Sequence, residues 1–295
     1  MDLRRLTYFL AVAEHGSMAK AAGALEVSQP TLSQQIGALE RDLASVLFDR
    51  TGRGMQLTEP GRLLCDHARR LLANAEAARI AIAELESGTS GMLSVGIIHT
   101  YSTAFLPKVI AAFGKLHPGV SLKVEEATAL GVERAILAGK LDVGIAFAPP
   151  EHPELGVDVL FEERLALVLA KGHAWSSRRS IPITSLRQIP LALLTNAFAT
   201  RRILDAALGP GSKLDIKVEM NSVEALIELA KDGGFPTVLA DRSLGSRKDL
   251  AVVPIGPPWI KRSGALLWDA HRYQTAAARA FMAIVRQHMR FVYPL

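Results

Sequence analysis

The sequence predicts an α/β protein in three parts: a small helical head, one long helix and two α/β lobes in tandem. Three observations support this fold class. Apolar residues recur at helical spacing through most of the first 45 residues, and a heptad pattern occupies 58–87. Beyond 91 the pattern alternates between strands and helices. With 295 residues, 49% of them hydrophobic and 21% charged, the chain suits two or three globular domains.

Charge and composition exclude several classes of protein. The net charge is +5, yet residues 1–60 hold six basic and seven acidic residues, and the positive excess lies near the C-terminus. Bulk charge therefore does not argue for nucleic-acid binding by the head. The apolar runs are too short to span a bilayer, and the N-terminus has no secretory pattern. A single cysteine, Cys65, excludes an intramolecular disulfide framework, so we expect a cytoplasmic protein.

The head is predicted to contain three helices joined by tight turns. The first covers 3–14 and ends at Gly16; Ser17 is placed to cap the second, at 18–25. Ser28 is the natural N-cap of the third, with Pro30 in its first turn, where a missing N–H costs nothing. Two helices joined by such a turn have the geometry of a helix-turn-helix.

The third helix presents a polar, nearly uncharged outer face. Leu32, Ile36 and Leu39 share its inner face, and Gln34 lies opposite, a side chain suited to reading base edges in a major groove. The run 47–58 then reads as a hairpin, or wing, whose Gly-flanked tip carries Arg53, suited to a minor groove. The alternative is a helical bundle whose polar face meets only water; the turn, caps and wing together favour DNA reading.

At this point the sequence resembles the LysR-type transcriptional regulators. The resemblance rests on Phe9 with residues 11–17, Ala21-Ala22, Leu25 with 27–33, Ile36 with Leu39-Glu40, Leu47-Phe48 with Arg50, and Leu57-Thr58 with Gly61. By this resemblance the fold is a winged helix-turn-helix, a dimerisation helix and a two-lobed effector domain like that of type 2 periplasmic binding proteins. It implies DNA contacts by Gln29, Pro30, Thr31, Ser33, Gln34 and Arg53.

Residues 59–87 are predicted to form one helix too long for its own chain to bury. Its apolar seam alternates spacings of four and three residues, as in a coiled coil. The seam consists of Leu64, Ala68, Leu71, Ala75, Ala78, Ile82 and Leu85. We expect this seam to join two chains; the alternative is that the helix lies along its own domain. In the family resembled, this helix pairs two heads to match a two-fold operator, as a homodimer or homotetramer.

The remaining chain is predicted to be a hinge at 88–91 and two lobes. Lobe 1 is predicted to comprise 92–161 plus 268–295, and lobe 2 to comprise 162–267. The DNA-binding domain is predicted to comprise residues 1–58. The expected strands are 93–98, 121–125, 142–147, 191–194, 216–219 and 236–240; the expected helices are 105–116, 132–138, 201–208, 223–230 and 274–289. The resemblance places the crossings between lobes near Glu162 and Leu267.

Polar side chains follow the strand ends of both lobes, where ligands of α/β proteins collect. Hydroxyl and amide groups beside free backbone N–H groups favour a small anion, although helix capping alone would explain each one singly. With the contacts that the resemblance implies, the candidate effector residues are Thr100, Ser102, Thr128, Phe147, Phe198 and Thr200, with His99 beside them. The regions 141–149 and 198–201 look most like the cyanate-responsive branch. Residues 232–240 depart from the family pattern.

No catalytic motif or metal-ligand spacing is visible among the sequence patterns, so we expect no enzyme activity, cofactor or metal. The leading hypothesis is a regulator that binds double-stranded promoter DNA, senses a small anionic effector and, by the resemblance, acts on RNA polymerase. The second is a cytoplasmic small-molecule binding protein or enzyme whose first helices serve only assembly.

Overall fold

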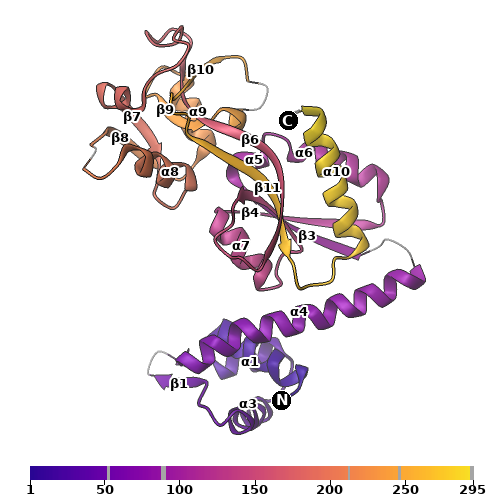
Figure 1. The fold of residues 1–295 in the computed structure, drawn as a ribbon. Coiled ribbons are helices and arrows are strands. Elements are labelled where there is room, and N and C mark those ends of the chain that lie inside the picture. The colour runs from indigo at the N-terminus through magenta and orange to yellow at the C-terminus, as the bar shows by residue number, and fades with distance from the viewer. Residues whose placement is uncertain (52–53, 88–90, 212, 245–246, 293–295) are drawn as a thin grey trace. The chain divides into compact units, whose positions relative to one another are not determined.

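The computed structural model describes residues 1–51, 54–87, 91–211, 213–244 and 247–292, so Arg53 and residues 88–90 lie outside it. The chain divides into two compact units (Figure 1). The first comprises Met1–Gly88 with the short segments Leu137–Lys140 and Arg272–Thr275; the second comprises the rest. Each unit is described by itself below.

The head contains the predicted three helices and hairpin. These are α1 (Leu3–His15), α2 (Met18–Ala24), α3 (Gln29–Asp42), β1 (Phe48–Thr51) and β2 (Gly54–Leu57). Ser17 and Ser28 cap α2 and α3 as predicted, each accepting a hydrogen bond from the backbone N–H three residues on. Gly16 ends α1 with φ at 59°, and its carbonyl accepts from Met55 N at 2.9 Å. The wing is thereby tied to the turn between α1 and α2.

Helix α4 (Glu59–Ser87) follows the wing as one uninterrupted element of 29 residues. At 1.5 Å per residue it is roughly 44 Å long. Its first turns close the apolar core of the head, in which Cys65 and Ala68 pack with Phe9, Leu32 and Leu39. Within the described part of the chain, no helix is both long and apolar enough to cross a bilayer.

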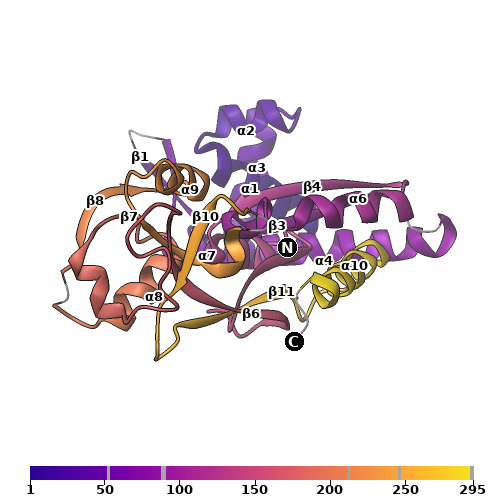
Figure 2. The same cartoon turned by 90° about the horizontal axis from the view of Figure 1, so that it is seen from above.

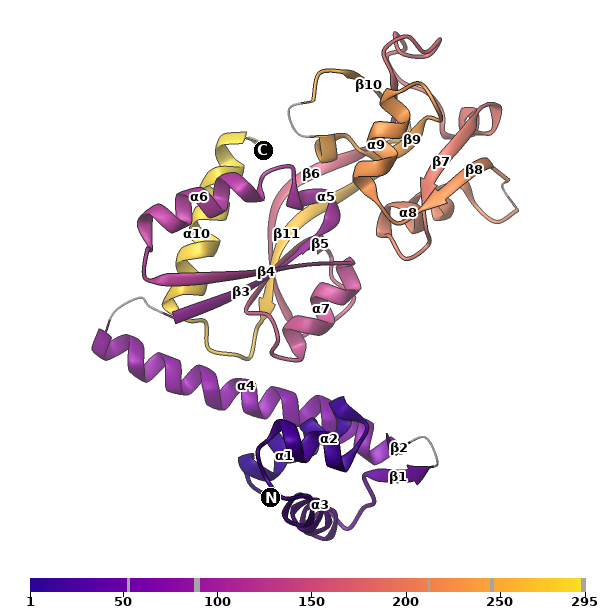
Figure 3. The ribbon, with the colours of Figure 1, turned by 180° about the vertical axis from the view of Figure 1, so that it is seen from behind.

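Lobe 1 is built on the parallel strands β3 (Gly91–Ile98), β4 (Val120–Ala127) and β5 (Val143–Ala148), in the order β4-β3-β5. Helices α6 (Leu106–Leu116) and α10 (Ala276–Val292) lie side by side, as Figures 2 and 3 show, with Phe113 packed on Phe281. Helix α7 (Ala129–Leu137) follows β4, and the single turn α5 (His99–Ser102) follows β3. The predicted alternation of strand and helix is present.

Lobe 2 repeats this strand–helix order. Strands β7 (Pro190–Leu194) and β8 (Asp215–Met220) pair in parallel, with α8 (Ala199–Leu208) between them in sequence. Helix α9 (Val223–Lys231), β9 (Thr237–Ala240), β10 (Leu250–Pro254) and the short 3₁₀ helices η1 (Ile183–Gln188) and η2 (Asp241–Leu244) complete the lobe. Two apolar clusters fill it, one around Leu186 and Leu204 and the other around Leu226 and Leu239.

Two long antiparallel strands that the sequence reading did not predict join the lobes. They are β6 (Leu155–Ala170) and β11 (Lys261–Asp269). Strand β6 pairs with β11 in its first half and with β9 and β10 in its second half, so it runs through both lobes, and Glu162 lies near its middle. The return crossing is earlier than the predicted Leu267, because Ser263 already pairs with β5 of lobe 1. The lobes therefore share a continuous two-stranded connection.

Candidate functional site

Helix α3 exposes its outer face to solvent while its inner face packs in the core of the head. Of the predicted DNA contacts, Gln29, Pro30, Thr31 and Gln34 are exposed and Ser33 is half-buried; Arg53 lies outside the described residues. On the opposite side Leu32, Ile36 and Leu39 are buried in the core of the head. The Oγ of Ser28 also lies 2.8 Å from the hydroxyl of Thr31, which fixes the first turn. The face thus has the exposure that reading DNA requires.

The far end of α3 is held by ion pairs with the N-terminus of the chain. The Asp42 carboxylate accepts from the N-terminal ammonium at 2.9 Å and from Arg5 Nη1 at 2.6 Å. The hydrogen bond from the ammonium, helped by Arg5, holds the pKa of Asp42 below its ordinary value. Arg5 Nε donates to Gln35 Oε1 at 3.1 Å. These contacts join the C-terminal end of α3 to α1 and to the first residue of the chain.

The residues of the predicted seam of α4 differ in burial along the helix. Its beginning belongs to the core of the head: Ala68 is fully buried there and Leu64 packs against it, so Ala68 is not available to a partner helix. Further along, Leu71 is 43% exposed and Ile82 is 63% exposed. Ala78 is exposed too, Ala75 is half-buried, and the side chain of Leu85 lies outside the described part. The seam that remains open therefore begins at Leu71.

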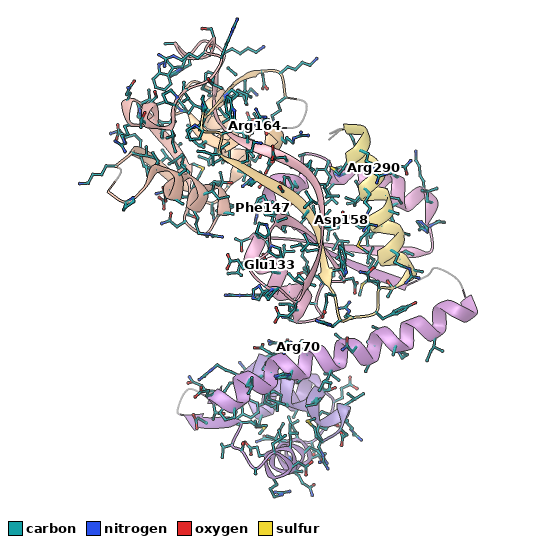
Figure 4. All side chains as sticks on the ribbon, viewed as in Figure 1. Arg70, Glu133, Phe147, Asp158, Arg164 and Arg290 are labelled. Carbon is teal, nitrogen blue, oxygen red and sulfur yellow. The ribbon has the colours of Figure 1, made fainter. Side chains whose placement is uncertain are left out.

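A buried ion pair lies where the two lobes join. Glu163 on β6 and Arg262 on β11 are opposite one another in the strand register and are only 1% and 6% exposed. Arg262 Nε donates to Glu163 Oε1, and the Tyr101 hydroxyl donates to the same oxygen at 2.8 Å. The guanidinium carbon of Arg262 lies 4.0 Å from the centroid of the Phe147 ring, a cation–π contact. Figure 4 labels Phe147, and also Asp158 and Arg164 on the two sides of this point of β6.

The first turn of α8 connects this ion pair to lobe 2. Arg262 Nη1 donates to Thr200 Oγ1 at 2.7 Å, so the guanidinium bridges the connecting strands and the second lobe. The rings of Phe198 and His99 are 5.6 Å apart, which joins α8 to α5 of lobe 1. The two lobes meet through residues that the sequence reading had singled out from both.

Two polar atoms of the pair have no hydrogen-bond partner. Arg262 Nη2 and Glu163 Oε2 are both inaccessible to solvent, and each lacks a partner in the described structure. Buried polar groups are nearly always hydrogen-bonded, because an unpartnered group has lost water without compensation. The guanidinium thus retains donor capacity at the junction of the lobes.

The other predicted effector residues occupy more ordinary positions. Thr100 is buried in the single turn α5, and Ser102 Oγ donates to the carbonyl of His99 at 3.2 Å. Thr128 Oγ1 accepts from Gly131 N at 3.2 Å and so caps α7. The structure gives the hydroxyls of Ser102 and Thr128 local contacts, whereas it brings Phe147 and Thr200 together around Arg262.

The sequence reading missed Tyr101, Glu163 and Arg262. A charged residue inside an otherwise apolar strand could have indicated a buried ion pair. Glu163, however, is one of three consecutive charged residues, and its neighbours Glu162 and Arg164 are exposed, so the sequence does not show which of the three is buried. Only the register, which pairs residues 99 apart in the chain, identifies the inward one.

A separate pocket of about 260 Å³ lies in lobe 2, away from the ion pair. It is lined by Ala170, Gly172, His173, Ala230, Gly233 and Pro236. Two of these residues belong to the segment 232–240 that departs from the family pattern. None of the candidate effector residues lines this pocket.

Comparisons with known proteins agree with this architecture. The family model described as "Bacterial regulatory helix-turn-helix protein, lysR family" matches residues 3–62, and that described as "LysR substrate binding domain" matches residues 86–290. A probable RuBisCO transcriptional regulator of Trichormus variabilis is 30% identical, over 95% of this chain and 86% of its own length. A hydrogen peroxide-inducible genes activator of Dickeya chrysanthemi is 29% identical, over 98% of this chain and 96% of its own.

Two solved structures cover the whole architecture. A full-length OxyR variant from Pseudomonas aeruginosa has a TM-score of 0.74 at 25% identity and covers 98% of this chain and 95% of that one. Full-length CbnR, solved with its target DNA, has a TM-score of 0.65 at 26% identity and covers 97% and 99%. The predicted fold class is confirmed, and the chain belongs to the LysR family of transcriptional regulators, with a DNA-binding helix-turn-helix head and a two-lobed effector-binding domain.

Proposed function

We propose that this regulator reads promoter DNA with α3 as a homodimer or homotetramer and responds to a small anion bound beside Arg262. The observation that carries the effector proposal is the buried guanidinium at the junction of the lobes, whose Nη2 has no hydrogen-bond partner among the described residues. A buried cation with spare donors is the group that recognises a carboxylate or a similar planar anion. In this proposal the rings of Phe147 and Phe198 form the apolar wall of the site, and Thr200 supplies a hydroxyl.

The two heads are proposed to be joined by the open part of the α4 seam. Exposed Leu71, Ala78 and Ile82 repeat at intervals of seven and four residues, which places them on one face of the helix. With a head of nearly balanced charge, specific affinity depends on presenting two reading helices at once. We also propose that the protein works in the cytoplasm and acts on RNA polymerase at the promoter, as the family resemblance implies.

Two of the relatives are named for peroxide or OxyR, yet peroxide does not fit this chain as effector. Its one cysteine, Cys65, is buried in the core of the head, and burial raises the pKa of that thiol. Oxidation by peroxide proceeds through the exposed thiolate, which both features disfavour. We therefore propose an effector that binds reversibly without redox chemistry.

The anion proposal predicts thermal stabilisation of the full chain. At a concentration one hundred times its Kd, an anion that binds only the folded state adds about 2.7 kcal/mol of stability. Replacing Thr200 by Val removes the hydroxyl that holds Arg262 in position and whose own O–H can donate to an anion. We expect this to reduce the shift, measured by differential scanning fluorimetry with acetate, nitrate and phosphate. Thr7→Val is the control, because Thr7 lies in the head and its hydroxyl donates to the carbonyl of Leu3. Absence of a shift from every anion contradicts the proposal.

A binding protein or enzyme whose head serves only assembly would give a different result with DNA. A gel shift with DNA from beside its own gene tests the alternatives directly. We expect a specific complex that survives excess unrelated DNA, because base-edge contacts add to the non-specific affinity. Complexes that unrelated DNA removes equally well would favour the alternative.

A further inference from the structure

The group at the junction of the lobes already contains an anion of its own. The hydrogen-bonded cluster holds one guanidinium, from Arg262, and one carboxylate, from Glu163, so its net charge is zero. Resting on the function proposed above, we propose that Glu163 is a built-in counter-ion that competes with the effector for Arg262. Glu163 then sets the anion concentration to which the regulator responds, and the effector is a small monoanion resembling a carboxylate.

The geometry supports competition between two carboxylates for one cation. Glu163 takes the Nε edge of the guanidinium, Thr200 accepts from Nη1, and Nη2 is left unpartnered. An anion on Nη2 would share the cation with Glu163, whose Oε2 is itself buried without a partner. Two carboxylates and one cation carry a net negative charge, which is costly where water is excluded. The effector therefore binds only as well as it can offset or displace Glu163.

Charged side chains around the cluster have contacts of their own. The neighbours of Glu163 in the chain, Glu162 and Arg164, point away from the cluster and are exposed. On η2, the guanidinium of Arg242 stacks over the ring of Phe161, 5.5 Å from its centroid, and Asp241 beside it accepts from Arg164 N. On α5 the Tyr101 hydroxyl donates to Glu163 and holds it in place.

The proposal predicts that neutralising Glu163 sharpens the response to anions. In Glu163→Gln the amide oxygen still accepts from Tyr101 and Arg262, while the competing charge is gone. The full-length chain is titrated with acetate at constant ionic strength, and the thermal shift is followed. We expect half-maximal stabilisation at an acetate concentration about tenfold lower than in the wild type, which corresponds to the removal of about 1.4 kcal/mol of repulsion.

Three further arms assign the effect to charge at this position. Asp158→Asn removes a carboxylate from the same strand, where Asp158 pairs with Arg286, and should leave the acetate response unchanged. Arg262→Gln should abolish the response with or without Glu163→Gln. Acetamide, the neutral analogue of acetate, should act equally on the wild type and Glu163→Gln. If Glu163→Gln fails to fold, Glu163→Met removes the same charge with a side chain of similar length and should also lower the acetate concentration required.

The results separate this inference from the function it rests on. An acetate response in Glu163→Gln equal to or weaker than that of the wild type overturns the counter-ion proposal and leaves the anion effector standing. No shift from acetate, nitrate or phosphate in either protein contradicts the anion effector itself.

Discussion

Replacing Arg262 by Leu is expected to lower the free energy of unfolding of the effector domain by about 3–5 kcal/mol, the range for breaking one half of a buried ion pair. The substitution leaves the Glu163 carboxylate in an environment that is 99% shielded from water, with only the Tyr101 hydroxyl to satisfy it. It also removes the bridge to Thr200 and the contact with the Phe147 ring. Urea unfolding of the full chain, followed by circular dichroism, measures this loss.

A double variant distinguishes an unpaired charge from lost packing. Glu163→Leu combined with Arg262→Leu removes both charges, and apolar replacement of a whole buried pair is often neutral or stabilising. We expect the double variant to regain most of the stability that Arg262→Leu loses. Equal instability in the single and double variants would mean that shape rather than charge holds this junction.

Placing a charge on the open seam of α4 is expected to weaken specific DNA binding by about 10²–10⁴-fold, the gain that linking two binding modules supplies. Leu71→Asp and Ile82→Asp put a carboxylate on the exposed apolar face where two helices are proposed to meet. Each chain would then present one reading helix rather than two. Sedimentation velocity reports the assembly, and fluorescence anisotropy with promoter DNA reports the affinity.

A charge change elsewhere on the same helix is the control. Glu76 is exposed, pairs with Arg79 and lies on a different side of α4 from Leu71. Glu76→Lys should leave the assembly unchanged. If Leu71→Asp and Ile82→Asp also sediment as wild type, the seam does not join chains, and α4 has a different partner.

Local signals explain what the sequence predicted well. The caps Ser17 and Ser28 and the turn at Gly16 are encoded within a few residues, so the helices of the head could be read directly. The spacing of hydrophobic residues changes wherever a strand gives way to a helix, and this change predicted the parallel strands of both lobes. The seam of α4 was read only in part, because its period does not reveal that Ala68 is used by the core of the head.

Long-range pairing explains what was missed. Strands β6 and β11 have mixed burial patterns because each serves two lobes, so no single alternation marks them. Glu163 and Arg262 become partners only when these two strands pair in the correct register. That register changes by one residue at a bulge between Gly264 and Ala265, which the sequence does not reveal. Thr200 and Phe147 were predicted on the family resemblance, but the cation that brings them together was not. The sequence therefore named two residues that contact the buried cation and missed the cation itself.

The central claim, that α3 reads DNA, is tested most directly by the affinity of Gln34→Ala for promoter DNA from beside the gene. Gln34 is exposed on the outer face of α3, and an amide that reads a base edge contributes about 1–3 kcal/mol. We expect specific affinity to fall roughly ten- to a hundredfold, while affinity for unrelated DNA stays unchanged. The control Gln287→Ala, at an exposed position on α10, should keep the specific affinity of the wild type. Wild-type specific affinity in Gln34→Ala would contradict the assignment of this face as the reading surface.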